Sequence, residues 1–219
     1  SSSLIFTSNT SGSFQINSKG SVLLDGGTLT LTMGGGGFYN ANQISLNNGS
    51  TFTFTGTNPQ NVANISIDST SSMTINAAKF ENIGQDANSG FTSSVANLTI
   101  NGGSLIVSGN LFNGGTNQGG AKASGGGNIT LYGGSLSANS VYSMSGGGKN
   151  SSISLYGGIL NATNVENRAG STLTFGALKG TMGKIVGNVT NNGNIIINAA
   201  GANAGTHTLI TGTLTGGGG

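Results

Sequence analysis

Charge is scarce in this chain, and cysteine is absent. Only 5% of the 219 residues are Asp, Glu, Lys or Arg, whereas about a quarter is usual in a globular domain. The seven Lys and Arg exceed the five acids by two, and they are scattered along the sequence. Nucleic acids and membrane surfaces attract clustered cations, so the sequence predicts neither partner. Without cysteine there is no disulfide framework, thiolate metal site or thiol nucleophile.

Long apolar runs are absent as well. No stretch approaches the length of about 18 residues that spans a bilayer, so we expect no membrane insertion by this segment. No signal peptide opens the chain, and a run of glycines closes it, which indicates an excised or processed segment. The 42 glycines invite a disordered interpretation, but 34% of the residues are hydrophobic and the net charge is only +2. Disordered chains have the opposite balance, which favours a folded chain.

A short pattern, apolar-x-Gly-Gly-x-Leu, recurs four times and joins stretches in which apolar residues alternate with polar ones. The copies occupy residues 24–29, 100–105, 131–136 and 155–160. Alternation is typical of a half-buried strand. The apolar residues that flank the glycines are an odd number of positions apart, so a straight strand would send them to opposite faces. We therefore expect the glycines to turn corners, although a single Gly-Gly pair is also compatible with a hairpin.

The spacing between related turns favours stacked coils over hairpins. Gly27 and Gly49, Gly134 and Gly158, and Gly170 and Gly193 are 22 to 24 residues apart. This unit fits two or three short strands and is too short for repeated strand–helix units. The sequence thus predicts an all-β parallel β-helix, a solenoid of roughly nine or ten coils that forms one domain over residues 1–219. We expect outward Thr and Asn side chains to form ladders along it.

Two regions break the repeat and are predicted to protrude. The step from Gly103 to Gly134 is longer than one unit, which indicates a glycine-rich loop within residues 113–127. Residues 76–90 contain an unusual concentration of charge and are expected to form a helical turn or a longer loop rather than part of a wall. Since loops often carry recognition, we predict that this second segment contacts a partner through Lys79, Phe80, Glu81 and Asp86.

Candidate catalytic residues are few. Asp25 and Asp68 occupy comparable positions about two coils apart and could be a carboxylate pair, but Asp is also a common turn residue, and we favour that role. His207 is the single histidine and is expected on an exposed strand. The run from Gly146 to Asn150 lacks two residues of a phosphate-binding loop, and no calcium-binding β-roll repeat is present. The sequence predicts no enzyme, metal site or cofactor.

Residues 134–142 and 158–175 resemble repeats in the vacuolating-cytotoxin-like autotransporters of Helicobacter. The resemblance implies a passenger domain that is a right-handed parallel β-helix, exported through an outer-membrane barrel and displayed on or released from the cell. The glycine-zipper segment that the family associates with pore formation has no counterpart in this sequence, so vacuolating activity is not implied.

Together these observations predict a structural or adhesive stalk in host colonisation. Its expected partner is a host cell surface or receptor, with self-association through strand edges at the ends. The alternative is a receptor-binding or oligomerising segment of a vacuolating-type toxin. A carbohydrate-active β-helix enzyme is a third class, and it would require a cluster of acids in a groove.

Overall fold

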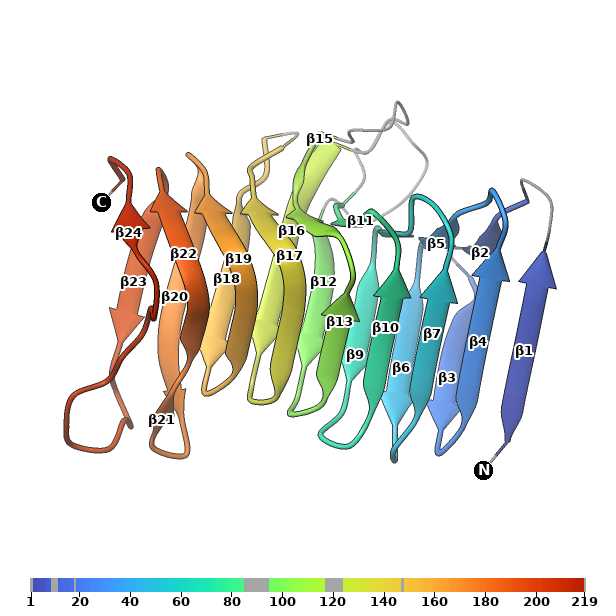
Figure 1. The fold of residues 1–219 in the computed structure, drawn as a ribbon, viewed down its shortest axis with the longest axis horizontal. Coiled ribbons are helices and arrows are strands. Elements are labelled where there is room, and N and C mark those ends of the chain that lie inside the picture. Colours follow the sequence, from blue (N-terminus) through green and yellow to red (C-terminus); the bar gives the residue numbers. More distant parts are fainter. Residues whose placement is uncertain are drawn as a thin grey trace.

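The chain forms a rod of stacked parallel coils, with its two ends at opposite ends of the rod (Figure 1). The computed structural model describes residues 2–8, 12–17, 19–84, 95–116, 124–146 and 148–218, and within these ranges it contains strands and no helix. The front strands of Figure 1 run upward and the rear strands run downward as the chain advances from right to left, so the coil is right-handed. The predicted right-handed parallel β-helix is confirmed.

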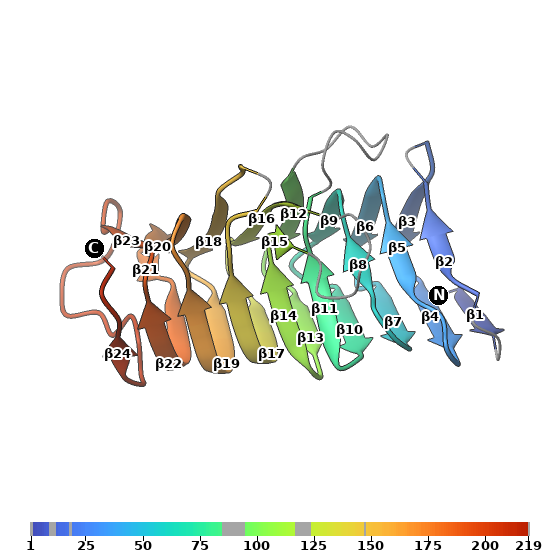
Figure 2. The ribbon, with the colours of Figure 1, turned by 90° about the horizontal axis from the view of Figure 1, so that it is seen from above.

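Each coil passes through three walls, named here in the order in which a coil visits them. The first wall consists of β3 (Ser21–Asp25), β6 (Gln43–Asn47), β9 (Asn64–Ile67), β12 (Val95–Ile100), β16 (Ser124–Leu131), β18 (Ser151–Tyr156), β20 (Ser171–Leu178) and β23 (Asn194–Asn198). The second wall begins with β1 (Ser3–Ser8), β4 (Thr28–Met33), β7 (Thr51–Thr55), β10 (Ser72–Asn76) and β13 (Ser104–Val107). The third wall begins with β2 (Phe14–Ile16), β5 (Phe38–Asn40), β8 (Gln60–Asn61), β11 (Lys79–Asn82) and β14 (Asn110–Asn113), which Figure 2 shows from above.

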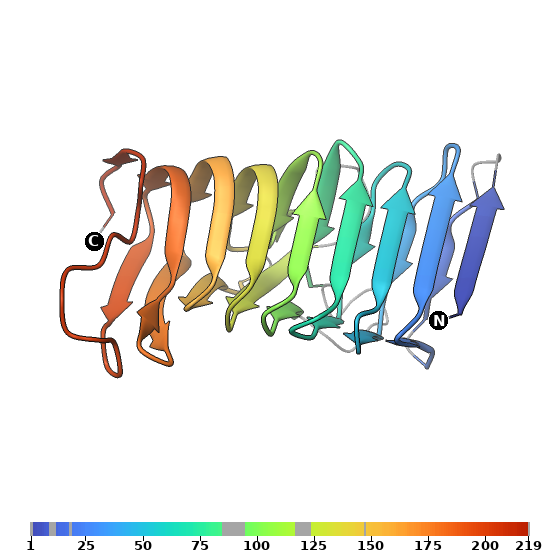
Figure 3. The same cartoon turned by 60° about the horizontal axis from the view of Figure 1, so that its bottom comes forward.

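In the C-terminal half, single strands run through both the second and the third wall. These are β17 (Ser135–Ser143), β19 (Ile159–Asn167) and β22 (Lys184–Asn191), and β24 (Leu214–Thr215) pairs with the end of β22. Two short strands pair antiparallel: β15 (Gly115–Thr116) with β16, and β21 (Thr181–Met182) with β20. The strands otherwise lie side by side in parallel along the whole rod (Figure 3).

The rod has about eight turns, fewer than the nine or ten predicted. The prediction was too high because it applied one repeat length to the whole chain. Thr28 pairs with Thr51 and Thr51 with Ser72, which are turns of 23 and 21 residues. Ser72 pairs with Ser104 and Ser104 with Ser135, which are turns of 32 and 31 residues. The two segments predicted to protrude fall within these two long turns.

The Gly-Gly pairs lie at the corner between the first and second walls, along the bottom of Figure 1, as the sequence predicted. The first glycine of each pair has a positive φ; for Gly102 it is 117°, a conformation that side chains with a Cβ rarely adopt. The second glycine permits close stacking. A Cβ on Gly103 would lie 2.2 Å from the carbonyl oxygen of Asp68 in the neighbouring coil. The corner therefore needs glycine at both positions, for different reasons.

Alternation along each strand builds one continuous core. In β4 the side chains of Leu29, Leu31 and Met33 point inward and are at most 4% exposed, while the intervening threonines are half-buried on the outer face. Their equivalents from successive coils stack on them, as Leu31 does on Phe54. Burying aliphatic and aromatic side chains in this way stabilises the fold by about 1.5 to 3 kcal/mol for each fully buried chain.

A buried ladder of asparagines runs along the corner where the third wall returns to the first. The repeated unit is an inward apolar residue, an outward residue and then an inward polar residue, with Asn40, Asn61, Asn82, Asn113, Ser143, Asn167 and Asn191 in the last position. Asn61 Nδ2 donates to Asn82 Oδ1 at 2.7 Å and to the carbonyl oxygen of Asn97 at 3.1 Å. Each such amide therefore joins the next ladder residue to the start of the first wall.

Ser143 interrupts this ladder. Its shorter side chain is reached by Asn113 Nδ2 only at 3.4 Å, against 2.7 to 2.9 Å between the asparagines. On the other side, Asn167 Oδ1 is buried without a hydrogen-bond partner. A buried acceptor left unpaired costs about 1 to 3 kcal/mol, so the break is a local weakness in the core.

Candidate functional site

The segment chosen from its charge is a wall strand, so the expectation of a helical turn or loop is wrong for residues 79–82. β11 pairs in parallel with β8 and β14 and alternates like its neighbours. Phe80 points into the core and is 0% exposed, so its side chain is not available to a partner. Lys79 and Glu81 are the outward positions. Asp86 and residues 85–90 lie outside the described residues, as do residues 117–123 of the other predicted loop.

Lys79 and Glu81 form an ion pair on the outer side of the third wall. Lys79 Nζ lies 2.8 Å from Glu81 Oε1, and Gln60 Nε2 from the preceding coil donates to Glu81 Oε2. The lysine side chain is 19% exposed, whereas Glu81 is 1% exposed. The carboxylate is thus compensated by one cation and one amide, as a buried charge requires.

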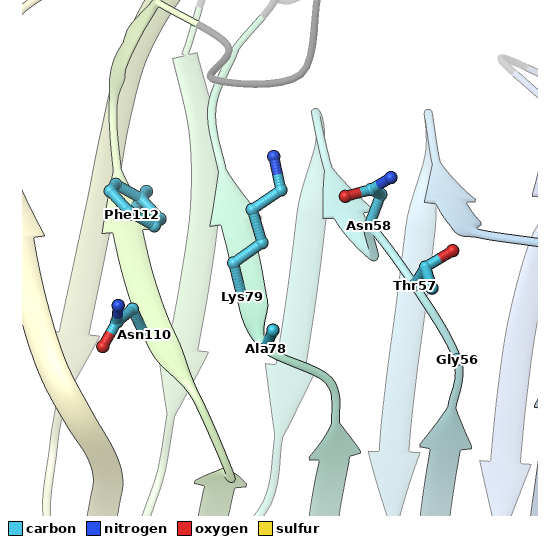
Figure 4. A pocket seen from close by; sticks show the side chains of 7 residues that line it. All are labelled: Gly56, Thr57, Asn58, Ala78, Lys79, Asn110 and Phe112. Carbon is cyan, nitrogen blue, oxygen red and sulfur yellow. The ribbon is translucent and has the colours of Figure 1, made fainter.

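A groove crosses three consecutive coils beside this ion pair (Figure 4). It has a volume of about 420 Å³ and is lined by Gly56, Thr57, Asn58, Ala78, Lys79, Asn110 and Phe112. In Figure 4, Lys79 stands between Asn58 on one side and Phe112 on the other. The groove therefore follows the rod axis and presents an amine, two amides, a hydroxyl and an aromatic ring.

Small residues at the corner between the second and third walls make room for the groove. Gly56 and Ala78 occupy this corner in successive coils. A Cβ on Gly56 would lie 2.8 Å from the Phe54 ring, so a larger residue cannot be added there without movement of the core. Larger side chains rise only on the flanks of this floor, from Asn58, Lys79 and Asn110.

An aromatic and charged row continues the groove toward the C-terminal end. Phe112 and Tyr142 lie in register in adjacent coils, and their rings stack with centroids 5.0 Å apart and planes 13° apart. The Arg168 guanidinium lies 5.6 Å from the centre of the Tyr142 ring and is paired with Glu166 through two hydrogen bonds, of 2.9 and 3.2 Å. Stacked rings and a cation over a ring are favourable contacts, which keep this row ordered on the surface.

Phe112, Tyr142 and Arg168 were not singled out from the sequence. The signal that could have found Phe112 and Tyr142 is the ladder: each directly precedes an inward polar residue, Asn113 or Ser143, at the position that Glu81 occupies before Asn82. This spacing identifies the outward column of the third wall. Charge density alone pointed to only one member of it.

Asp25 and Asp68 act as turn residues at the first corner, as favoured from the sequence. Asn48 Nδ2 donates to Asp25 Oδ1, and the backbone N–H of Asn48 donates to Asp68 Oδ2 at 2.7 Å. The N–H groups of Thr70 and Ser71 donate to Asp68 Oδ1 at 3.0 and 2.8 Å. Burial opposes ionisation of Asp68, but hydrogen bonds from Ser71, Asn48 and Thr70 outweigh it and lower its pKa to about 2. Both carboxylates are thus engaged in holding turns.

The other candidates from the sequence also have structural roles. His207 is exposed, as expected, but it lies in an irregular segment rather than a strand, and its Nε2 is 2.8 Å from the carbonyl oxygen of Asn203. Gly146 and Lys149 exchange two backbone hydrogen bonds and close a tight turn. Within the described residues, no three His, Cys, Asp or Glu side chains come together to hold a metal. Nor does any helix in that part of the chain have the length and apolarity to cross a membrane.

Comparison with known proteins adds no relative. No family model, curated protein or solved structure matches the chain.

Proposed function

We propose that this chain is a rod-like passenger segment, displayed on or released from a bacterial cell, that serves as an adhesive stalk in host colonisation. The observation that carries the proposal is the groove beside Lys79, which opens on the flank of an otherwise regular rod. A pocket with converging polar groups is the usual form of a ligand site. The resemblance of residues 134–142 and 158–175 to autotransporter repeats supports the extracellular location.

In this proposal the rod has two tasks. Its continuous core holds the third wall rigid over many coils, so the stalk carries the binding groove away from the cell surface. The groove and the row that follows it, from Thr57 to Arg168, make the contact with a host surface or receptor. The role is non-enzymatic and needs no cofactor.

The proposal is tested by binding of the fluorescently labelled full chain to cultured epithelial cells. We expect saturable binding that Phe112→Ala and Asn110→Ala weaken. Two matched variants on the second wall, Ile106→Ala and Asn161→Ala, should bind like the original, because both residues point outward far from the groove. Absence of saturable binding, or equal losses in all four variants, would overturn the proposal.

A toxin segment that oligomerises is the second candidate, and the ends of the rod favour it. At the first coil Leu4 and Leu23 are each 65% exposed, and at the last coils Ile197 is 61% and Leu214 55% exposed. β1, β2 and β3 are edge strands of the described sheets, and open edges with apolar residues promote strand pairing. Concentration-dependent end-to-end oligomers that release dye from phosphatidylcholine vesicles would favour the toxin; oligomers without release would leave the adhesive stalk preferred.

A further inference from the structure

The groove on the third wall has the chemistry of a sugar-binding site. We propose that it binds a linear, uncharged oligosaccharide that lies along the rod axis, an inference that rests on the proposed adhesive function. The lining combines one aromatic ring, from Phe112, with the amides of Asn58 and Asn110 and the hydroxyl of Thr57. Sugars present apolar C–H faces together with many hydroxyl groups, and this lining offers a partner for each.

The charge balance of the groove favours an uncharged ligand. Lys79 is the cation of the groove lining, and Glu81 Oε1 lies 2.8 Å from its Nζ. An anionic ligand would have to compete with this carboxylate, which cannot move into water because Glu81 is buried. The lysine retains N–H donors beyond the one directed at Glu81. Hydroxyl oxygens can accept from these donors without disturbing the ion pair.

The amide of Asn110 is oriented for donation. Asn139 Nδ2 from the next coil donates to Asn110 Oδ1 at 3.0 Å, which fixes the amide and leaves its Nδ2 group for a ligand. A side chain held in this way loses less entropy when a ligand binds. Asn110 therefore acts as a preset donor beside the Phe112 ring.

The row beyond Phe112 determines the shape of the ligand. From the coil of Thr57 to that of Glu166 the row crosses five coils, a distance of about 19 Å at the usual strand spacing. Tyr142 follows Phe112 directly, and Arg168 with Glu166 closes the row. Contacts repeated coil after coil suit an extended chain that runs parallel to the axis. A single sugar would reach only the groove itself.

The direct test is titration of the full chain with linear neutral tetrasaccharides, cellotetraose and lacto-N-neotetraose among them, followed by isothermal calorimetry and a glycan array. We expect at least one neutral series to bind, more tightly as it lengthens from two to four sugars. Phe112→Ala should weaken binding about tenfold or more, as loss of a central aromatic contact does. Asn110→Ala, which alters no ring, should also weaken it, while Ile106→Ala and Asn161→Ala should not.

Three results would overturn the proposal: no neutral oligosaccharide binding at millimolar concentration, binding confined to sulfated or sialylated glycans, or binding that both groove variants leave unchanged. Circular dichroism of each variant ensures that a loss of binding is not a loss of fold.

Treatment of the epithelial cells separates this inference from the proposed function. If periodate oxidation of cell-surface sugars abolishes adhesion, both stand. If adhesion survives periodate, is removed by protease and still depends on Phe112, the groove binds a protein; the adhesive function then holds and the sugar proposal fails. If untreated cells are not bound at all, the adhesive function fails, whatever the calorimetry shows.

Discussion

Replacement of Ser143 by asparagine should complete the buried amide ladder and stabilise the rod. The new Oδ1 would accept from Asn113 Nδ2, whose present bond to Ser143 Oγ is long at 3.4 Å. The new Nδ2 would donate to Asn167 Oδ1, which is buried and unpaired. It would also reach the carbonyl oxygen of Thr172, which is in register with Ser152, the residue whose carbonyl accepts from Asn113.

The expected gain follows from these contacts. Pairing a buried acceptor recovers about 1 to 3 kcal/mol, and each added neutral hydrogen bond contributes about 1 kcal/mol net. Against this, fitting the larger amide into a packed site costs about 1 to 3 kcal/mol if the walls must move. We expect a net increase of about 1 to 2 kcal/mol in the free energy of unfolding. For a chain of this size that raises Tm by roughly 2 to 8 °C.

The assay is urea and thermal unfolding followed by far-ultraviolet circular dichroism, with hydrogen exchange at β17 and β19 to detect local changes. Repeat arrays can unfold in parts, so the exchange rates report on the ladder directly. Ser143→Asp is the matched control, because it has the shape of asparagine without the donor and should destabilise. Asn82→Ser creates a second break and should cost about 2 to 4 kcal/mol. If Ser143→Asn left stability unchanged or lowered it while Ser143→Asp behaved alike, the unpaired oxygen would not be the weakness that we describe.

Three further predictions follow from the walls and corners. Gly176→Ala should destabilise the rod by about 1 to 3 kcal/mol and reduce the near-ultraviolet tyrosine signal, because the new Cβ would lie 2.3 Å from the Tyr156 ring; an unchanged signal and Tm would contradict this. The pKa of Asp68 is lowered to about 2 from 3.8, so its contribution to stability is present above about pH 4 and lost as the pH falls toward 2; Asp68→Asn should flatten the stability curve in this window, and an identical curve would refute the assignment. Burial raises the pKa of Tyr39 to about 12, so ultraviolet titration of the folded protein should show one late phenol that disappears in Tyr39→Phe.

Local rules made the walls and one corner readable from the sequence. Alternation of apolar and polar residues, as in residues 28–33, is a property of the strand itself, and it places Leu29 and Leu31 on one face in any β-structure. The Gly-Gly pairs could be interpreted because a positive φ favours glycine regardless of context. Asp68 could be assigned to a turn for a similar reason, since its hydrogen bonds reach backbone groups two and three residues away.

The sequence misled where charge outweighed periodicity. Residues 79–82 alternate as outward, inward, outward, inward, but Lys79 and Glu81 made the segment resemble a protrusion. A charged side chain is tolerated on a wall when its partner stands two residues away on the same face, as here. Tertiary register, rather than composition, decides whether such a pair covers the wall or leaves it.

The sequence by itself determined that this chain is a parallel β-helix with glycine corners, because strand period and turn conformation are local. Only the tertiary structure decided which residues meet across coils. It placed the asparagines inside, where each amide is paired only by the coil that follows, and it assembled the groove from Thr57, Lys79 and Phe112, which are more than 20 residues apart along the chain. Coil lengths that vary from 21 to 32 residues hide these neighbours from any fixed repeat, and hydrogen-bond register between strands brings them together.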